Sequence, residues 1–100
     1  MPDTCPCTQR KKERPAEEYT DLIHRLNRIE GQIRGIRGMV ERSAYCTDIL
    51  TQVAAANAAL SAFSRVLLAE HIRTCVAEDI RAGKDGTVEE LIATLQRLMK

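Results

Sequence analysis

The sequence predicts an all-α protein whose three-helix protomer is built around a long central helix and associates with further copies of itself. The stretch 43–82 contains neither glycine nor proline, and its apolar residues recur at alternating steps of four and three, the spacing of a helix that packs along another helix. Aromatic residues make up only 3% of the chain and alanine is frequent, which suits closely packed helices. A chain of 100 residues buries only a modest fraction of its surface when it folds alone, so association is expected.

The first residues, MPDTCPCTQRKKERP, combine prolines, polar residues and a run of charges. They lack the apolar surface that offsets the entropy of ordering, so we expect a disordered tail at 1–15 and a single helical domain at 16–100. Cys5 and Cys7 form a C-x-C pair in this tail. As accessory thiols they could chelate a soft metal, although two exposed thiols without fixed structure are the simpler interpretation.

The first helix is expected to begin just after Pro15, with Glu17 and Glu18 placed favourably against the positive end of the helix dipole. Its apolar seam consists of Leu22, Leu26, Ile29, Ile33, Ile36 and Val40. Glycines at 31, 35 and 38 each cost roughly 1 kcal/mol relative to alanine in a helix interior. They indicate either the close approach of another backbone or fraying near Gly38.

Cap residues delimit the central and last helices. Ser43 is the expected N-cap of the central helix and Gly83 its expected stop. Its seam consists of Ile49, Val53, Ala56, Leu60, Phe63 and Leu67. After a turn at 83–86, Thr87 and Glu90 have the spacing of a capping box, with Thr87 as N-cap. The short amphipathic helix that follows has its apolar residues at Leu91, Ile92, Leu95, Leu98 and Met99.

Three residues of the central helix are candidate metal ligands. His71 and Cys75 are four residues apart, so both side chains share one helix face within reach of a single ion, although a pair of core residues would have the same spacing. Cys46 lies about 37 Å from His71 along a continuous helix, and therefore cannot join the pair within one chain. Two antiparallel copies bring Cys46 of one chain beside His71 and Cys75 of the other. The spacing predicts two identical sites at the ends of a dimer.

The chemistry of these donors leaves several functions open. Two thiolates and one imidazole are a soft set that suits Cu(I), whereas Zn(II) would need a fourth ligand from Glu90, water or the tail thiols. Because Cys46 lies near a helix start, where the dipole favours a thiolate, a thiol redox or persulfide sensor is the main rival. A copper-storage or copper-chaperone bundle without DNA binding is a further interpretation. None of these requires catalysis, and we expect no enzyme.

The charge and the hydropathy of the chain exclude few classes of function by themselves. The formal net charge is +1, so a basic surface for nucleic acid would have to form by local clustering of arginines from several chains. The first residues contain no apolar run that could serve as a signal peptide, and no window approaches the length of a transmembrane span. We expect a cytoplasmic protein without a membrane partner.

The runs RLNRIEGQIRGI from Arg25, YCTDILTQV from Tyr45 and HIRTCV from His71 resemble the CsoR/RcnR family of metal-sensing transcriptional repressors, in its copper-sensing CsoR branch. The resemblance covers roughly residues 20–99. It implies an antiparallel dimer with a four-helix-bundle core that pairs again into a tetramer, a dimer of dimers. It also implies a repressor that binds double-stranded operator DNA without metal and is released when Cu(I) binds.

The resemblance assigns roles to single residues. It makes Cys46, His71 and Cys75 the Cu(I) ligands. It places Tyr45 and a glutamate at the start of the last helix around the ligands, and we choose Glu90 over its neighbour Glu89.

DNA contacts in the family come from basic residues without a helix-turn-helix. Arg25 matches a family position, and Arg28 and Arg65 are our further candidates. Ala58 and Ser61 stand where basic residues are often expected, with Arg65 one turn beyond Ser61. The presence of both His71 and Cys75 disfavours the nickel, cobalt, persulfide and formaldehyde branches.

Overall fold

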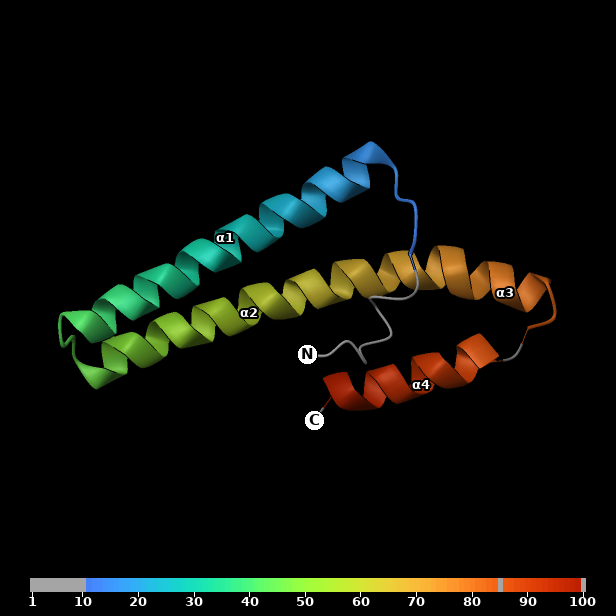
Figure 1. The fold of residues 1–100 in the computed structure, drawn as a ribbon. Helices are drawn as coiled ribbons and strands as arrows, with labels where there is room; N and C mark the ends of the chain where they lie inside the picture. Colours follow the sequence, from blue (N-terminus) through green and yellow to red (C-terminus); the bar gives the residue numbers. More distant parts are fainter. Residues whose placement is uncertain (1–10, 85, 100) are drawn as a thin grey trace. The chain divides into compact units, whose positions relative to one another are not determined.

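The computed structural model describes residues 11–84 and 86–99. Its elements are α1 (Ala16–Glu41), α2 (Cys46–His71), the π-helical turn η2 (Ile72–Val76), α3 (Ala77–Arg81) and α4 (Gly86–Leu98), shown in Figure 1. The elements α2, η2 and α3 follow one another without a break and form one helical run, Cys46–Arg81. The structure confirms the prediction of an all-α protomer with three helices and a long central one.

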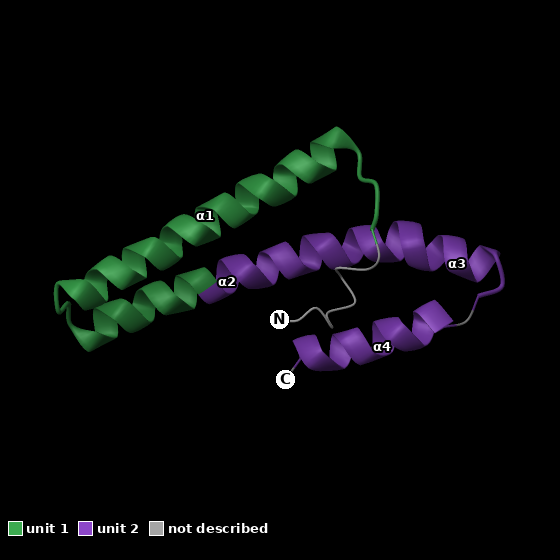
Figure 2. Cartoon of the chain, viewed as in Figure 1, with its two compact units in different colours: residues 1–56 green, residues 57–100 purple. Residues whose placement is uncertain are grey.

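The chain divides into two compact units, coloured separately in Figure 2. Residues 1–56 form the first unit, which holds α1 and the beginning of α2. Residues 57–100 form the second, which holds the remainder of α2 together with η2, α3 and α4. The boundary falls inside α2, so Cys46 belongs to the first unit and both His71 and Cys75 belong to the second.

α1 begins directly after Pro15, as predicted. The carbonyl of Pro15 accepts the N–H of Tyr19 at 3.0 Å, and Glu17 and Glu18 lie in the first turn. The helix continues past Gly38 to Glu41, so it does not fray at the glycines. A Cβ added at Gly31 or Gly38 would meet only an arginine side chain, and one added at Gly35 would meet nothing within 4 Å. Within the described residues, therefore, no other backbone approaches these glycines closely.

Ser43 does not cap α2, contrary to the prediction. It has a φ of 58° and terminates α1, because its N–H donates to the carbonyl of Val40 at 3.1 Å and the N–H of Ala44 donates to that of Met39 at 2.9 Å. These two bonds define a Schellman motif, in which the left-handed residue is usually glycine. The sequence misleads here because serine is a common N-cap and an uncommon left-handed residue. α2 begins only at Cys46.

The apolar seam of α1 separates into two rows, each with a spacing of seven residues. In one row, Leu22 and Ile29 are 8% and 6% exposed. In the other row, Leu26, Ile33 and Val40 are 39%, 57% and 60% exposed. The chain therefore buries the row that contains Leu22 and Ile29 and leaves the row that contains Leu26, Ile33 and Val40 exposed to solvent.

α2 has no buried residue, although it is the most apolar of the long helices. The run Cys46–Arg81 is long and apolar enough to cross a membrane by length and composition, with a mean hydropathy of 1.2 over its best window, none of which is buried. The expectation that no window approaches a transmembrane span is therefore wrong by this measure. The run is this apolar because frequent alanines add to the aliphatic residues of its seam. A single helix of this kind is weak support for a membrane span, since the core helix of a soluble protein has the same composition.

The second unit folds α4 back against the end of the long helical run. Val76 in η2 is its buried residue, at 5% exposure, and α4 contacts η2. The run ends as predicted at Gly83, which has a φ of 79° and, with Lys84, closes a second Schellman motif onto the carbonyls of Ile80 and Asp79.

The start of α4 differs from the predicted capping box. α4 begins at Gly86, so Thr87 lies inside its first turn rather than before it. The Thr87 hydroxyl donates to Oδ2 of Asp79 in α3. The residue that local spacing assigns to a cap is therefore used for a tertiary hydrogen bond, which ties the start of α4 to α3.

Candidate metal centre

His71 and Cys75 flank the point at which the long helical run changes its hydrogen bonding. His71 is the last residue of α2, and Cys75 lies within η2. Both side chains are half-buried, and Cys75 is a free thiol. A spacing of four residues along a helix keeps an imidazole and a thiol on one face, as the sequence predicts.

The turn between them has five-residue hydrogen bonding. The N–H of Ala77 reaches the carbonyl of Ile72, five residues earlier, and that of Thr74. Single π turns inside α-helices are rare and occur frequently at functional sites. The sequence gives no sign of this π turn in the form of a helix-breaking residue, because residues 71–77 contain neither glycine nor proline.

Thr74 lies beside Cys75 and contacts the backbone of the preceding turn. Its hydroxyl donates to the carbonyl of Glu70 at 2.7 Å and lies 3.7 Å from Sγ of Cys75. The Glu70 carboxylate is in turn paired with Arg73, with Oε2 3.0 Å from Nη2. Sequence reasoning missed Thr74. The sequence does contain a signal. The apolar seam ends at Leu67, and the next two seam positions hold the polar residues Glu70 and Thr74.

Cys46 is the first residue of α2, and its thiol is free and exposed. The preceding residue, Tyr45, starts the helix with its backbone: its carbonyl accepts the N–H groups of Asp48 and Ile49 at 3.1 and 3.2 Å. The Tyr45 side chain is exposed. Both residues therefore present their side chains at the start of α2, at the opposite end of that helix from His71.

Within the part of the chain that the structure describes, no group of three or more His, Cys, Asp or Glu residues is close enough to hold a metal ion. This agrees with the spacing argument, because α2 by itself spans about 37 Å between its first and last residues. The donors nevertheless fit a soft metal: two free thiols and one half-buried imidazole.

The other predicted site residues lie as follows. Glu89 and Glu90 are exposed in the first turns of α4, the helix that contacts η2. Cys5 and Cys7 lie outside the described residues.

The three predicted DNA contacts are arginines with different surroundings. Arg25 donates from Nε to Oδ2 of Asp21 at 3.0 Å. Arg28 is exposed on α1, and no described residue forms an ion pair with it. Arg65 is exposed on α2 beside a groove of ≈ 230 Å³ that residues of α2 and α4 line, among them Leu68 and Leu95.

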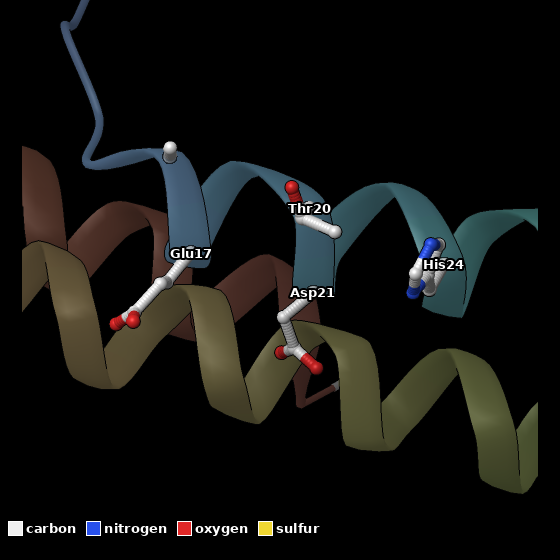
Figure 3. Close-up of a pocket in the computed structure, with 5 residues that line it drawn as sticks. Glu17, Thr20, Asp21 and His24 are labelled. Atoms are coloured by element: carbon white, nitrogen blue, oxygen red, sulfur yellow. The ribbon is translucent and has the colours of Figure 1, made fainter.

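A separate hollow of ≈ 430 Å³ lies at the start of α1, lined by Ala16, Glu17, Thr20, Asp21 and His24. Figure 3 shows that the carboxylates of Glu17 and Asp21 extend to the same side of the helix, with Thr20 pointing away from them. The Asp21 carboxylate is already held by Arg25. The hollow contains no thiol and is distinct from the soft donors of α2 and η2.

Comparison with known proteins defines the class to which this fold and these donors belong. The chain matches the family model of metal-sensitive transcriptional repressors over residues 18–97. It is 41% identical over 87 residues to the copper-sensing transcriptional repressor CsoR of Bacillus subtilis (strain 168), an alignment that covers 85% of each protein. The chain belongs to the CsoR family of metal-sensitive transcriptional repressors, which are not enzymes and which act on DNA.

Two solved structures show the same fold. The crystal structure of the copper-sensing repressor CsoR with Cu(I) from Geobacillus thermodenitrificans NG80-2 matches with a TM-score of 0.85 and 41% identity, covering 90% of this chain and 95% of that one. The nickel-responsive transcriptional regulator InrS matches with a TM-score of 0.60 and 31% identity, covering 89% of this chain and 93% of that one. The fold is therefore shared by regulators that respond to different metals.

Proposed function

We propose that this protein is a cytoplasmic Cu(I)-responsive repressor that binds operator DNA as a metal-free homotetramer and is released when Cu(I) binds between two protomers. The Cu(I) ligands are Cys46 of one protomer and His71 and Cys75 of another. One observation carries the proposal: the soft donors lie at opposite ends of α2, so that only pairing of two antiparallel copies gathers them.

The open row of α1 and the uncovered surface of α2 support this assembly. Leu26, Ile33 and Val40 repeat every seven residues on α1 and remain exposed, and α2 has no buried residue. Burial of apolar surface contributes about 25 cal/mol per Å², which makes a second copy a favourable partner for both surfaces. In such a dimer α1 and α2 of two protomers form a four-helix core, and two dimers form the tetramer. The same pairing removes the apolar face of α2 from water without a membrane.

The donor set favours Cu(I) over the alternatives. Two thiolates with one imidazole suit a soft, monovalent ion, whereas Zn(II) prefers four ligands. Copper-sensing relatives at 41% identity support the same choice. Tyr45 and Glu90 would lie around the ligands in the dimer, where a hydrogen bond to the His71 ring would orient its metal-binding nitrogen.

Arg25 and Arg28 of α1 supply the DNA contacts in this proposal, together with Arg65. Replacing Arg28 by alanine is expected to weaken binding of the metal-free protein to operator DNA. It should also reduce the slope of log K against log salt by about one for each phosphate that the variant no longer neutralises. Gel-shift titrations at several salt concentrations measure both. Because Arg28 is exposed on α1, the variant is expected to keep the fold.

Arg37→Ala is the matched control. It removes the same charge from the same helix, but Arg37 lies nine residues further, about half a turn around α1, and its Nε is 3.4 Å from Oε2 of Glu41. We expect this variant to bind DNA nearly as the unchanged protein does. Equal losses for both variants would show that the arginines act only through net charge, and that the side of α1 that carries Arg28 has no special part in DNA binding.

Anaerobic titration with Cu(I) and with Zn(II), while binding to a DNA fragment from the protein's own promoter is followed, tests the function. The metal-free protein should shift the fragment at low salt, and about one Cu(I) per protomer should release it. The release requires that Cu(I) bind the DNA-incompetent state more tightly, typically by 5- to 150-fold, whereas Zn(II) should release little. Failure of the metal-free protein to shift the fragment would instead indicate a copper-storage or copper-chaperone bundle.

A thiol sensor is the second candidate, and the exposed free thiol of Cys46 at the first residue of α2 favours it. An exposed thiol is accessible to oxidants and persulfides, with which its thiolate form reacts. This function predicts a covalent link between Cys46 and Cys75 of two protomers after treatment with an oxidant or a persulfide. A non-reducing gel with mass spectrometry separates it from copper sensing.

A further inference from the structure

The π turn η2 gives the long helical run a second possible hydrogen-bonding register. Its five-residue bonding, from the N–H of Ala77 to the carbonyl of Ile72, holds one residue more than an α-helical turn. A change to four-residue bonding would rotate everything after the turn by about 100° and move it by about 1.5 Å relative to α2. His71 directly precedes this turn and Cys75 lies within it, so ligation of both is sensitive to its register.

The Thr74 hydroxyl has two acceptors within reach and one hydrogen to give. It donates to the carbonyl of Glu70 at 2.7 Å and lies 3.7 Å from Sγ of Cys75. A neutral thiol is a weak acceptor, so the carbonyl holds the hydrogen. A sulfur bound to a metal ion carries negative charge, and hydrogen bonds to charged acceptors are roughly twice as strong as neutral ones.

The bond to Glu70 also acts on the backbone. A threonine that donates to the carbonyl four residues earlier competes with the backbone N–H for that carbonyl and bends helices. In this chain the bond lies at the junction of α2 and η2. Loss of this bond would leave that carbonyl to backbone donors alone and favour the α-helical register.

We propose that Thr74 links the metal ligand Cys75 to the register of η2: when the sulfur binds Cu(I), the hydroxyl turns from the Glu70 carbonyl to that sulfur and the turn relaxes toward α-helical bonding. The inference rests on the proposed function in taking Cu(I) as the metal. It makes Thr74 a positioning residue and assigns it no metal coordination.

The change in register reaches the rest of the second unit through two contacts. Val76 is buried at the end of η2, and the Thr87 hydroxyl holds the start of α4 to Asp79 of α3. Rotation after the turn therefore carries α3 and α4 together. Because α4 lines the groove beside Arg65, the same movement changes the surroundings of a candidate DNA contact.

Three variants of the full-length chain test the proposal. Thr74→Val removes the hydroxyl and keeps the branched shape, while Thr74→Ser keeps the hydroxyl. Thr51→Val is the matched control, because the Thr51 hydroxyl donates to the carbonyl of Thr47 at 2.8 Å, the same bond on α2 away from the π turn. Amide hydrogen exchange is measured on the metal-free and Cu(I)-loaded proteins without DNA.

In the metal-free protein, Thr74→Val should slow exchange of the amides at 75–77 by about fivefold, the factor that one net hydrogen bond of about 1 kcal/mol corresponds to. Cu(I) should change exchange at 87–90, in the first turn of α4, by a similar factor in the unchanged protein, in Thr74→Ser and in Thr51→Val. In Thr74→Val this response to Cu(I) should fall below about twofold. The proposal is overturned if Thr74→Val exchanges as the unchanged protein does at 75–77, or if its α4 still responds to Cu(I).

DNA binding separates this inference from the function on which it rests. If Cu(I) alters exchange as expected but the unchanged protein stays on DNA, the proposed repressor function is wrong and the Thr74 link stands. If the unchanged protein leaves DNA on Cu(I) addition and Thr74→Val leaves it equally, with unaltered exchange, the link is wrong and the function stands.

Discussion

Replacing His71 by alanine is expected to leave much of the Cu(I) affinity in place and to abolish most of the release from DNA. The two thiolates of Cys46 and Cys75 remain, and thiolates supply most of the affinity for a soft ion. The imidazole is the donor at the end of α2, next to the π turn, so its loss removes the ligand that ties the ion to that side of the turn. Competition with a Cu(I) chelator measures the affinity, and the ratio of DNA affinities with and without Cu(I) measures the coupling.

Cys75→Ala is the matched comparison for this experiment. It removes a thiolate from the same side of the site, and we expect its Cu(I) affinity to fall by more than the 10- to 100-fold that changes around a ligand produce. The His71→Ala protein should therefore bind Cu(I) and stay on DNA, whereas the Cys75→Ala protein should fail at both steps. If His71→Ala released DNA as the unchanged protein does, the imidazole would have no part in the coupling.

Turn chemistry and periodicity predict most of the architecture. Pro15 and Gly83 mark helix ends in the sequence because one fixes φ and the other tolerates a positive φ, and both ends lie where expected. The seam of α1 is equally visible. Periodicity does not reveal which of the two rows is buried. Leu22 and Leu26 are both leucines, and they differ only in how far other residues cover them.

The errors arise where one residue type serves two purposes. Ser43 has the chemistry of an N-cap, yet it ends α1 with a φ of 58°. Thr87 has the spacing of a capping box, yet its hydroxyl is bonded to Asp79, eight residues earlier. In both cases a competing hydrogen bond outside the predicted local motif decides the structure, and single-sequence patterns do not contain it.

The candidate metal-binding residues can be predicted from the sequence, whereas the structure around them cannot. Residue type, spacing and the family resemblance predict Cys46, His71 and Cys75 as candidate ligands, and the distance along α2 predicts that one chain cannot gather them. The π turn between His71 and Cys75 is not predictable in this way, because π bonding has no composition of its own. The break in the seam after Leu67 is visible in the sequence, but the part played by Thr74 becomes visible only once its hydroxyl is located near Glu70 and Cys75.

A heterodimer of two different defective protomers is expected to recover one of its two Cu(I) sites. If one protomer carries Cys46→Ala and the other carries Cys75→Ala, an antiparallel pair leaves one site without either thiol. The second site keeps Cys46 from one chain and His71 with Cys75 from the other, so it is complete. Each homodimer, by contrast, has two damaged sites.

Cu(I) titration of this heterodimer, prepared with two different affinity tags and purified on both, tests the central claim most directly. The account predicts one Cu(I) per heterodimer bound as tightly as in the unchanged protein, with neither homodimer binding at that affinity. The chelator competition used for single variants gives the number and the affinity together. A heterodimer that binds no Cu(I) tightly, like its two parents, would contradict a site shared between protomers.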